Sequence, residues 1–581
     1  MTHEQDISSS AQPAASMSEP RQGADLFFQA ALHYGYRYVF GNPGTTEAVF
    51  MDALVRYPDL RFVLCLHENV ATGAAAGLAR LTGWPALVNL HLAPGLANGL
   101  SNMHNARKAG VPMVVTVGEH HTGHLLEDSP LAGDIEGLAR TVCKWTWTVK
   151  DAGELAAVLH RATMIAMMPP QGPVCLILPT NLLTAAPRTP DGRIPEIPAL
   201  HLPQLGPASH ADIIRAVDAL LAAHRPLLVI GNIGPDAQAS VNALAELTGA
   251  RVVYDTFPRR SDGPLLPNSV RLPYFPDQRR TLFSQADLLF LIGVMGFTTH
   301  FLYEYDPAPV VAPHTTVLHL DDDLEALGKN ERNSLPLYGD IPTSLQRLVA
   351  VLRERLNRPE QMPEAKTPRV STASHVGTNT PSGATSLSPK LLMQALHELL
   401  PADTILVDES VTARAALQSE FLDAGPAIGT YITNRGGALG AALPLAIGVQ
   451  LGAPDQLVVA IVGDGAAMYT IQALWTAAHY QLPILAVICN NASYDIIKLE
   501  MLRLQGTVAK SDRATLESIT GLGGPRLDFA SLAQGMGVKS WTIREATDLL
   551  PNLKAALETC AAGAPALVDV HLTALPVPSR K

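Results

Sequence analysis

The sequence has few cysteines, few aromatic residues and few charged residues for its length. Five cysteines are spread over 581 residues, and aromatic and charged residues make up 5% and 16% of the chain. The cysteines are scattered, at positions 65, 143, 175, 489 and 560. The pattern therefore favours reduced, buried thiols in a cytoplasmic protein over a disulfide framework or a cysteine-bound metal.

Long apolar runs and an excess of basic charge are also missing. No apolar run approaches the ~18 residues that a membrane-spanning helix needs. The net charge is −11, with acidic and basic residues interspersed, which argues against nucleic acid or an anionic membrane as a partner. Residues 1–22 are rich in Ser, Ala, Pro and Gln and carry no export-signal pattern, so we expect a disordered tail.

Apolar residues, by contrast, make up 47% of the chain. Short runs rich in β-branched residues alternate with helical patterns, which predicts an α/β fold of doubly wound parallel sheets. The length suggests three or four domains of ~150 residues each. We expect domains at 23–183, 208–356 and 389–577, a Pro-rich linker at 184–207, and a disordered linker rich in Pro, Thr, Ser and Gly at 357–388.

The most informative stretch runs from residue 458 to residue 494. It opens with the apolar run VVAIV, which predicts a buried parallel strand that ends at Gly463-Asp464-Gly465. A helical pattern follows, and then a second buried run that ends at Asn490-Asn491. Asp464 and Asn491 are thus expected at the carboxyl ends of parallel strands, the edge at which open α/β sheets bind ligands.

These residue types suit a magnesium-diphosphate site. Gly463 and Gly465 let the backbone approach a ligand closely, and the N–H groups of the following helix suit a phosphate. Asp464 and Asn491 offer oxygen ligands, and Mg²⁺ takes few protein ligands and uses phosphate oxygens for the rest. A lone Gly-Asp-Gly is usually a tight turn, but here 24 residues separate Gly465 from Asn490 and a strand precedes each end, which favours the site.

This spacing resembles the signature of thiamine diphosphate-dependent enzymes that act on 2-oxo acids. The chain is most similar to benzoylformate decarboxylases and acetolactate synthase-like proteins, from about residue 21 to residue 576. The resemblance implies pyrimidine-binding, middle and diphosphate-binding domains, with thiamine diphosphate and Mg²⁺ as cofactors. It also implies a small-molecule 2-oxo acid as substrate and a homodimer or homotetramer with each active site formed between chains.

The resemblance assigns the cofactor residues by position. Glu68, after the predicted strand at 61–66, matches the glutamate that hydrogen-bonds to N1′ of the aminopyrimidine; an acid favoured at a helix N-terminus is the alternative. Gly437 and Leu439 match the pyrimidine loop, which is otherwise a glycine-rich turn. The remaining matches are Ser410, Thr412, Gly463, Gly465 and Ala466 for the diphosphate, and Asp464, Asn491 and Ser493 for the metal. Helix capping explains Ser410 and Thr412 equally well.

The substrate side matches less closely. His91, before a predicted loop at 92–99, stands where benzoylformate decarboxylases have a pocket histidine, and is a candidate proton relay or a core histidine. Thr45 replaces their serine. Tyr303 occupies the place of their second catalytic histidine, with His300 just upstream. Ile496 and Glu500 share a helix face, where benzoylformate decarboxylases have a small and an aromatic pocket residue. His120-His121 is a further difference, a histidine pair similar to that of pyruvate decarboxylases.

These observations predict a non-oxidative decarboxylase of a 2-oxo acid that is smaller or more polar than benzoylformate. An acetolactate synthase-like carboligase is the first alternative, because the fate of the reaction intermediate decides between the two. A catalytically silent cofactor-binding protein is the second, since fold alone does not fix function. Relatives of the middle domain bind FAD or ADP, but this chain lacks a G-x-G-x-x-G motif there, so nucleotide binding is a minority interpretation.

Overall fold

A computed structural model describes residues 19–258, 261–262, 269–273, 276–297, 309–331, 333–356, 387–423, 429–505 and 513–574. The chain divides into two compact units, Met1–Leu202 and Pro203–Lys581. Residues 1–18 of the predicted tail, residues 357–386 of the predicted linker, and His300 and Tyr303 lie outside the described residues. Within the described part of the chain, no helix is both long and apolar enough to cross a membrane.

The first unit is built on a six-stranded sheet in the order β2-β1-β3-β4-β6-β5. Every neighbouring pair of strands is parallel. The central strands are buried on both faces, which explains their continuous apolar runs. The strands are β1 (Tyr38–Gly41), β2 (Arg61–Leu64), β3 (Ala86–Leu90), β4 (Met113–Glu119), β5 (Trp145–Thr148) and β6 (Pro173–Pro179).

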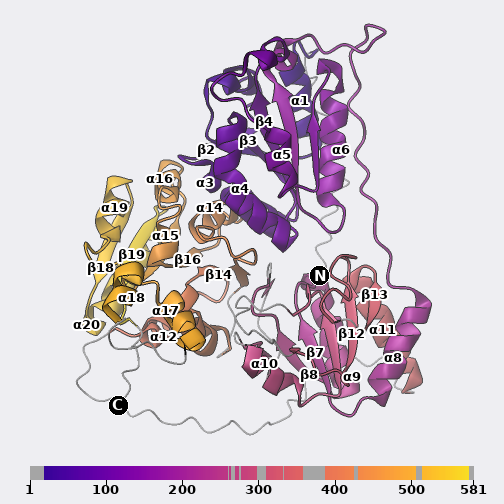
Figure 1. Ribbon diagram of the computed structural model, residues 1–581, viewed down its shortest axis with the longest axis vertical. Coiled ribbons are helices and arrows are strands. Elements are labelled where there is room, and N and C mark those ends of the chain that lie inside the picture. Colours follow the sequence, from indigo (N-terminus) through magenta and orange to yellow (C-terminus); the bar gives the residue numbers. More distant parts are fainter. Residues whose placement is uncertain are drawn as a thin grey trace. The chain divides into compact units, whose positions relative to one another are not determined.

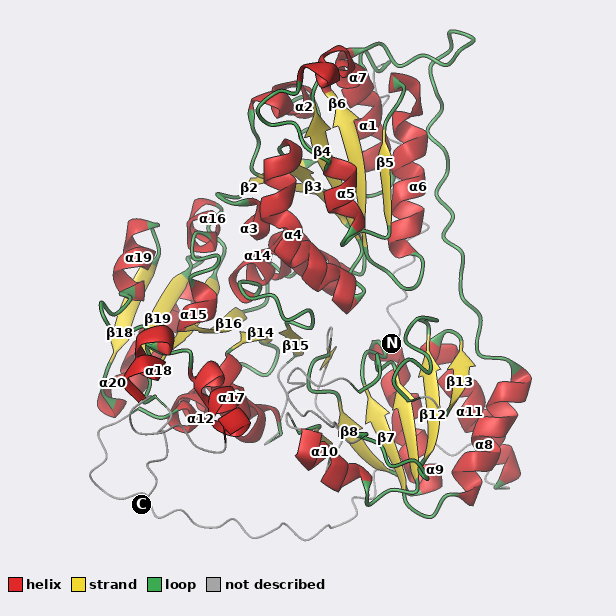
Figure 2. Cartoon of the chain, in the orientation of Figure 1, coloured by secondary structure: helices red, strands yellow, loops and turns green. Residues whose placement is uncertain are grey.

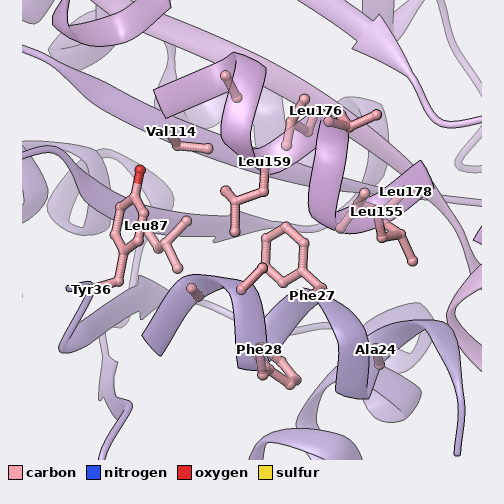
Figure 3. Packing of buried hydrophobic residues seen from close by; sticks show 14 of the residues in the cluster. Ala24, Phe27, Phe28, Tyr36, Leu87, Val114, Leu155, Leu159, Leu176 and Leu178 are labelled. Atoms are coloured by element: carbon pink, nitrogen blue, oxygen red, sulfur yellow. The ribbon is translucent and has the colours of Figure 1, made fainter. Parts of the chain in front are cut away.

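Helices cover both faces of this sheet (Figures 1 and 2). One face carries α1 (Gly23–His33), α2 (Ala48–Leu54) and α6 (Leu155–Met167). The other carries α3 (Glu68–Thr82), α4 (Leu92–Ala109) and α5 (Ile135–Arg140). Figure 3 shows Phe27 of α1 pointing toward Leu159 of α6, and both side chains are fully buried. Each such burial contributes ~1.5–3 kcal/mol, which holds the helices on the sheet.

Residues 92–99, expected as a loop, instead form the first turns of α4. His91 is its N-cap residue, and Pro94 lies in the first turn, where the missing N–H of proline is no loss. The error arose because Pro94, Gly95 and Gly99 suggest a loop when they are weighed by propensity alone. Gly95 packs against both His91 and Glu68, so this glycine serves close packing rather than a break in the helix.

The second unit contains two sheets. The first has the order β10-β8-β7-β11-β12-β13 and is parallel throughout. Helices α8 (His210–Ala222), α9 (Gln238–Thr248) and α11 (Ile341–Arg355) cover one face, and α10 (Pro276–Phe283) packs on the other. Its strands are β7 (Pro226–Ile230), β8 (Arg251–Tyr254), β10 (Val270–Arg271), β11 (Leu288–Ile292), β12 (Thr316–Asp321) and β13 (Ser334–Tyr338).

The second sheet of this unit has the order β18-β19-β17-β16-β14-β15-β9. Six strands are parallel, and the two-residue β9 (Ser261–Asp262) pairs antiparallel with β15. Helices α12 (Pro389–Leu399) and α20 (Ala546–Ala561) lie on one face, and α14 (Ala442–Gly452) and α16 (Ala473–His479) on the other. The parallel strands are β14 (Ile405–Glu409), β15 (Thr430–Thr433), β16 (Val458–Gly463), β17 (Ile484–Asn490), β18 (Lys539–Ile543) and β19 (Ala566–His571).

Three parallel sheets flanked by helices confirm the predicted fold class. All five cysteines are free thiols. In each sheet, apart from the short edge strand β9, the chain moves first to one side of its starting strand and then to the other. The resulting switch points lie between β1 and β3, between β7 and β11, and between β14 and β16. Ligands bind outside the carboxyl ends of strands at such points.

Candidate active site

The first group of predicted residues lies at the switch point between β1 and β3. Glu68 is the first residue of α3 and is only 7% exposed. Asn42, after β1, donates a hydrogen bond to Glu68 Oε1 at 3.4 Å, and Asn98 of α4 donates to Oε2 at 3.1 Å. His67 caps the helix by accepting from the N–H of Asn69 at 3.0 Å. The carboxylate of Glu68 is therefore fixed at the sheet edge by two amides and by its helix.

His91 forms a pair with a buried acid, Glu47, which the sequence reasoning left without a role. The distance from His91 Nδ1 to Glu47 Oε2 is 2.6 Å, and the N–H of Gly44 donates to the same oxygen at 2.9 Å. Burial raises the pKa of Glu47, and the neighbouring His91 opposes that rise. A Cβ at Gly44 would lie 2.4 Å from the His91 ring, and one at Gly118 would lie 2.0 Å from Glu47 Oε1. Both glycines therefore make room for the pair.

Thr45 and the histidine pair His120-His121 are the other residues predicted on the substrate side of the site. Thr45 is exposed and opens the single turn Thr45–Glu47. His120 follows β4 and is half-buried, and its Nε2 has no hydrogen-bond partner among the described residues. His121 lies in an exposed turn, with its ring 5.3 Å from that of His124. His120 thus presents a nitrogen at the same sheet edge, whereas His121 and His124 contact each other at the surface.

The second group lies at the switch point between β14 and β16. Asp464 directly follows β16 and is 4% exposed. Its Oδ1 accepts from the N–H of Gly465 at 2.8 Å, whereas its Oδ2 is buried and has no hydrogen-bond partner among the described residues. Burial raises the pKa of Asp464 to about 6. A buried carboxylate oxygen without a donor is costly, and a bound cation would remove that cost. The site therefore fits Mg²⁺.

The other predicted metal ligands lie beside Asp464. The backbone N–H groups of Ala492 and Ser493 lie close enough to the Asp464 carboxylate to oppose the rise in its pKa, although their hydrogen bonds go to Asn490 Oδ1 and Asn491 Oδ1. The side chain of Asn491 accepts from the N–H of Ser493 at 3.1 Å and donates to Asp495 at 3.0 Å. The turn after β17 therefore holds Asn491 and Ser493 next to Asp464.

Backbone strain coincides with the predicted site. Three non-glycine residues with positive φ each flank one of its members: Leu92 (φ 50°), Val411 (φ 48°) and Ala492 (φ 53°). They follow His91, separate Ser410 from Thr412, and separate Asn491 from Ser493. A β-branched residue such as Val411 rarely adopts this conformation, and such strain persists mainly at functional sites. The Oγ of Ser410 is also buried without a partner in the described structure, as a ligand contact would require.

The helix that the sequence predicts after the Gly-Asp-Gly turn is interrupted in the structure. Helix α15 (Asp464–Ala467) has only four residues, and helical structure resumes in α16 at Ala473. The ring of Tyr494 lies against Gly465, where a Cβ would be 2.3 Å from that ring. A larger residue at position 465 would therefore clash with the ring of Tyr494, whether or not a ligand is bound.

Helix α17 (Asp495–Gln505) carries the predicted pocket residues. Ile496 is half-buried and Glu500 is 9% exposed, and both lie on one face because they are four residues apart. Lys498, on the same helix, is paired with Glu517 of α18 (Arg513–Thr520) at 2.7 Å. Ile496 and Glu500 therefore place an aliphatic and a carboxyl side chain on the same face of α17.

Family models match the three parts of the chain in order. The model described as thiamine pyrophosphate enzyme, N-terminal TPP binding domain, matches residues 21–136. The corresponding central domain matches residues 213–348, and the C-terminal TPP binding domain matches residues 418–570. Thiamine pyrophosphate is another name for thiamine diphosphate. The matched segments contain Glu68, His91, Asp464 and Asn491.

Whole-length relatives agree with these matches. The chain is 33% identical to a protein of Mycobacterium tuberculosis named "Putative acetolactate synthase large subunit IlvX", covering 95% of this chain and 99% of that protein. It is 29% identical to benzoylformate decarboxylase of Pseudomonas aeruginosa, covering 94% and 97%. The solved 4-hydroxybenzoylformate decarboxylase of Rhodococcus jostii superposes with a TM-score of 0.81 at 26% identity, covering 95% and 99%. The chain therefore belongs to the thiamine diphosphate-dependent enzymes, among the carboxy-lyases and carboligases that include acetolactate synthases and benzoylformate decarboxylases.

Proposed function

We propose that the protein is a Mg²⁺- and thiamine diphosphate-dependent decarboxylase of a small or polar 2-oxo acid. The observation that carries the proposal is Oδ2 of Asp464, which is buried beside the Asn491–Ser493 turn and has no hydrogen-bond partner among the described residues. When bound, thiamine diphosphate supplies a carbon nucleophile and an electron sink for loss of CO₂. The protein has to bind the cofactor, orient it, exclude water and move protons.

Each group of residues has a role that suits its surroundings. Asp464, Asn491 and Ser493 would hold Mg²⁺ on the diphosphate, and Ser410 and Thr412 would bond its oxygens. Glu68, held by Asn42 and Asn98, would hydrogen-bond to the aminopyrimidine. Gly437 and Leu439 would support the pyrimidine from the glycine loop, and Gly463, Gly465 and Ala466 would line the approach to the diphosphate.

The Glu47–His91 pair is the proton-transfer group of this proposal. Glu47 Oε2 is 2.6 Å from His91 Nδ1, so the proton of the neutral imidazole resides on Nδ1, and Nε2 is left to accept a proton at the substrate and, once protonated, to return it. His91 is half-buried, with 19% of its side chain exposed. Its ring is therefore accessible to a small molecule while Glu47 remains shielded from water.

The substrate class follows from helix α17. Ile496 narrows the space that a smaller residue would leave, and Glu500 places a carboxyl group on the same face. A carboxyl group there disfavours a large apolar side chain, because such a side chain would strip water from the carboxyl without replacing its hydrogen bonds. Pyruvate or another small or polar 2-oxo acid therefore suits the pocket better than benzoylformate.

Carboligation is a second candidate, favoured by the 33% identical relative with an acetolactate synthase name. A catalytically silent protein is disfavoured by the presence of Glu68, Asp464 and Asn491 together. We also propose that the active unit is a homodimer or a homotetramer, in which Glu68 of one copy and Asp464 of another serve the same cofactor.

One experiment tests these proposals together. The purified protein is incubated with Mg²⁺ and thiamine diphosphate, and CO₂ release and acetolactate formation are measured for a panel that includes pyruvate and benzoylformate. We expect CO₂ release to depend on both cofactors, with a higher kcat/KM for pyruvate than for benzoylformate. Asp464→Ala is expected to abolish Mg²⁺-dependent cofactor binding with the fold intact. Undiminished cofactor affinity in that variant would contradict the metal assignment.

A further inference from the structure

We propose that Glu409 is a positioning residue that holds the glycine loop 434–440 in the conformation that receives the cofactor. Glu409 is the last residue of β14, at the switch point, and is 2% exposed. It directly precedes Ser410, whose hydroxyl is buried without a partner in the described structure. The inference rests on the proposed function, because it concerns how the cofactor site is assembled.

Glu409 contacts both ends of the loop. Its Oε1 accepts a hydrogen bond from Asn434 Nδ2 at 3.1 Å, at the start of the loop. Its Oε2 accepts from the N–H groups of Ala441 at 2.9 Å and Ala442 at 3.1 Å, just after the loop ends. The Ala441 N–H also lies 3.2 Å from Oε1. The carboxylate of Glu409 thus joins the two ends of the loop, and its partners lie 25 to 33 residues further along the chain. We call the hydrogen bonds from Glu409 to Asn434, Ala441 and Ala442 the Glu409 clasp.

Other contacts hold single residues within the loop: Arg435 lies 3.7 Å from Asp255, and Thr470 donates to the carbonyl of Gly440 at 3.1 Å, whereas Glu409 joins the two ends of the loop. Asn434 organises its first half by accepting from the N–H groups of Gly436 and Gly437 and by donating to the carbonyl of Ala438 at 2.6 Å. Gly437 and Gly440 both have positive φ, at 83° and 87°. Gly437 is exposed and nothing lies within 4 Å of where its Cβ would be. Movement of Asn434 would therefore move the whole first half of the loop.

The hydrogen bonds require Glu409 to be ionised. Every partner is an N–H donor, so a protonated carboxyl would turn one acceptor into a competing donor. Burial raises the pKa of Glu409 to about 7. Asp408 on β14 is the neighbouring charge that adds to this rise, and it is itself paired with Arg414 of α13 (Arg414–Leu417) at 3.0 Å and bonded to Tyr431 of β15 at 2.7 Å.

The raised pKa of Glu409 and its hydrogen bonds together give the direction in which pH should affect cofactor binding. Above about pH 7 the carboxylate is charged and the clasp is closed. As the pH falls through that value, the proton occupies one oxygen and competes with cofactor binding, which needs the ordered loop. Cofactor affinity is therefore expected to weaken as the pH falls from 8 to 6.

Glu409→Gln tests the inference, because glutamine resembles the protonated acid at every pH. Thiamine diphosphate affinity is measured from tryptophan fluorescence between pH 6 and 8.5 in saturating Mg²⁺. We expect at least about tenfold weaker binding at pH 8 and a flatter pH profile than in the wild type. Glu331→Gln, which alters a buried acid whose pKa is also raised but which lies between β12 and β13, is the matched control and should follow the wild type.

Amide hydrogen exchange of the cofactor-free proteins gives a second readout. Faster exchange in the peptide containing Ala441 and Ala442, with unchanged exchange in β16 and β17, is expected for Glu409→Gln. Asn434→Ala, which leaves the carboxylate in place, should also weaken cofactor binding and serves if the first variant does not fold. Wild-type affinity and pH dependence in Glu409→Gln would overturn the inference. A wild type that binds no cofactor would instead refute the proposed function, while exchange still tests the clasp.

Discussion

At the residue scale, three buried carboxyl groups have different partners and therefore different tasks. Glu47 is bonded to an imidazole, Glu409 to N–H groups, and one oxygen of Asp464 to no donor in the described structure. Burial raises the pKa of all three. The same desolvation thus acts on the Glu47 that orients His91, makes the Glu409 clasp sensitive to pH, and leaves Asp464 with an oxygen that a cation would satisfy.

Glu47→Gln tests the proton-transfer pair. An amide in place of the carboxylate offers no negative charge to the imidazole and no longer fixes which ring nitrogen carries the proton. We expect kcat/KM to fall by about 10²-fold, the lower range for loss of a general acid or base. The measurement is steady-state kinetics on the 2-oxo acid that the substrate panel identifies.

The control for this variant is Glu119→Gln, which changes a carboxyl at the end of the neighbouring strand that bonds to the N–H of His120. It should retain wild-type kinetics, and both variants should bind thiamine diphosphate as the wild type does. An unchanged kcat/KM in Glu47→Gln would show that His91 acts without its acid, or not at all.

At the scale of elements, the site is assembled by strand ends and by the strained turns that follow them. Leu92, Val411 and Ala492 adopt positive φ, and each is the second residue after β3, β14 and β17, respectively. The polar residue between each strand and its strained residue is therefore held at the sheet edge. Helix α17 then extends from one of these turns and presents side chains over that edge.

The double variant Ile496→Ala with Glu500→Phe tests the role of α17 in specificity. It opens space and replaces a carboxyl group with an aromatic ring on the same helix face. The ratio of kcat/KM for benzoylformate to that for pyruvate should rise by on the order of 10-fold or more, the effect expected for a change in pocket volume and polarity. If the ratio stays at its wild-type value, these two side chains do not shape the pocket.

A feature of the fold or of the site could be predicted from the sequence when the residues that form it are close together in the chain. The strands before Asp464 and Asn491 could be predicted because a buried parallel strand is a local apolar run with a glycine or an amide at its end. The Glu47–His91 pair spans 44 residues and the Glu409 clasp spans 25 to 33, and no local pattern indicates such contacts. The start of α4 at Leu92 was missed because packing of Gly95 against Glu68 and His91 outweighs its low helix propensity.

At the scale of the whole molecule, the predicted site residues are divided between two units. Glu68 and His91 belong to the first unit, and Glu409, Asp464 and Asn491 to the second. In the proposed function both groups serve one cofactor, and two-fold symmetry lets two copies of the chain form two such sites. Two copies that each lack a different one of these groups would then still form one complete site between them.

Complementation between two inactive variants tests this consequence. Glu68→Gln and Asp464→Ala are each expected to be inactive, since every site in either homodimer lacks one essential group. In a mixed dimer, isolated by two different affinity tags, one site carries both substitutions and the other carries neither. The mixed dimer should therefore regain about half of the wild-type activity per dimer. A mixed dimer as inactive as its parents would mean that each site is built from a single chain, and an active monomer in sedimentation would mean the same.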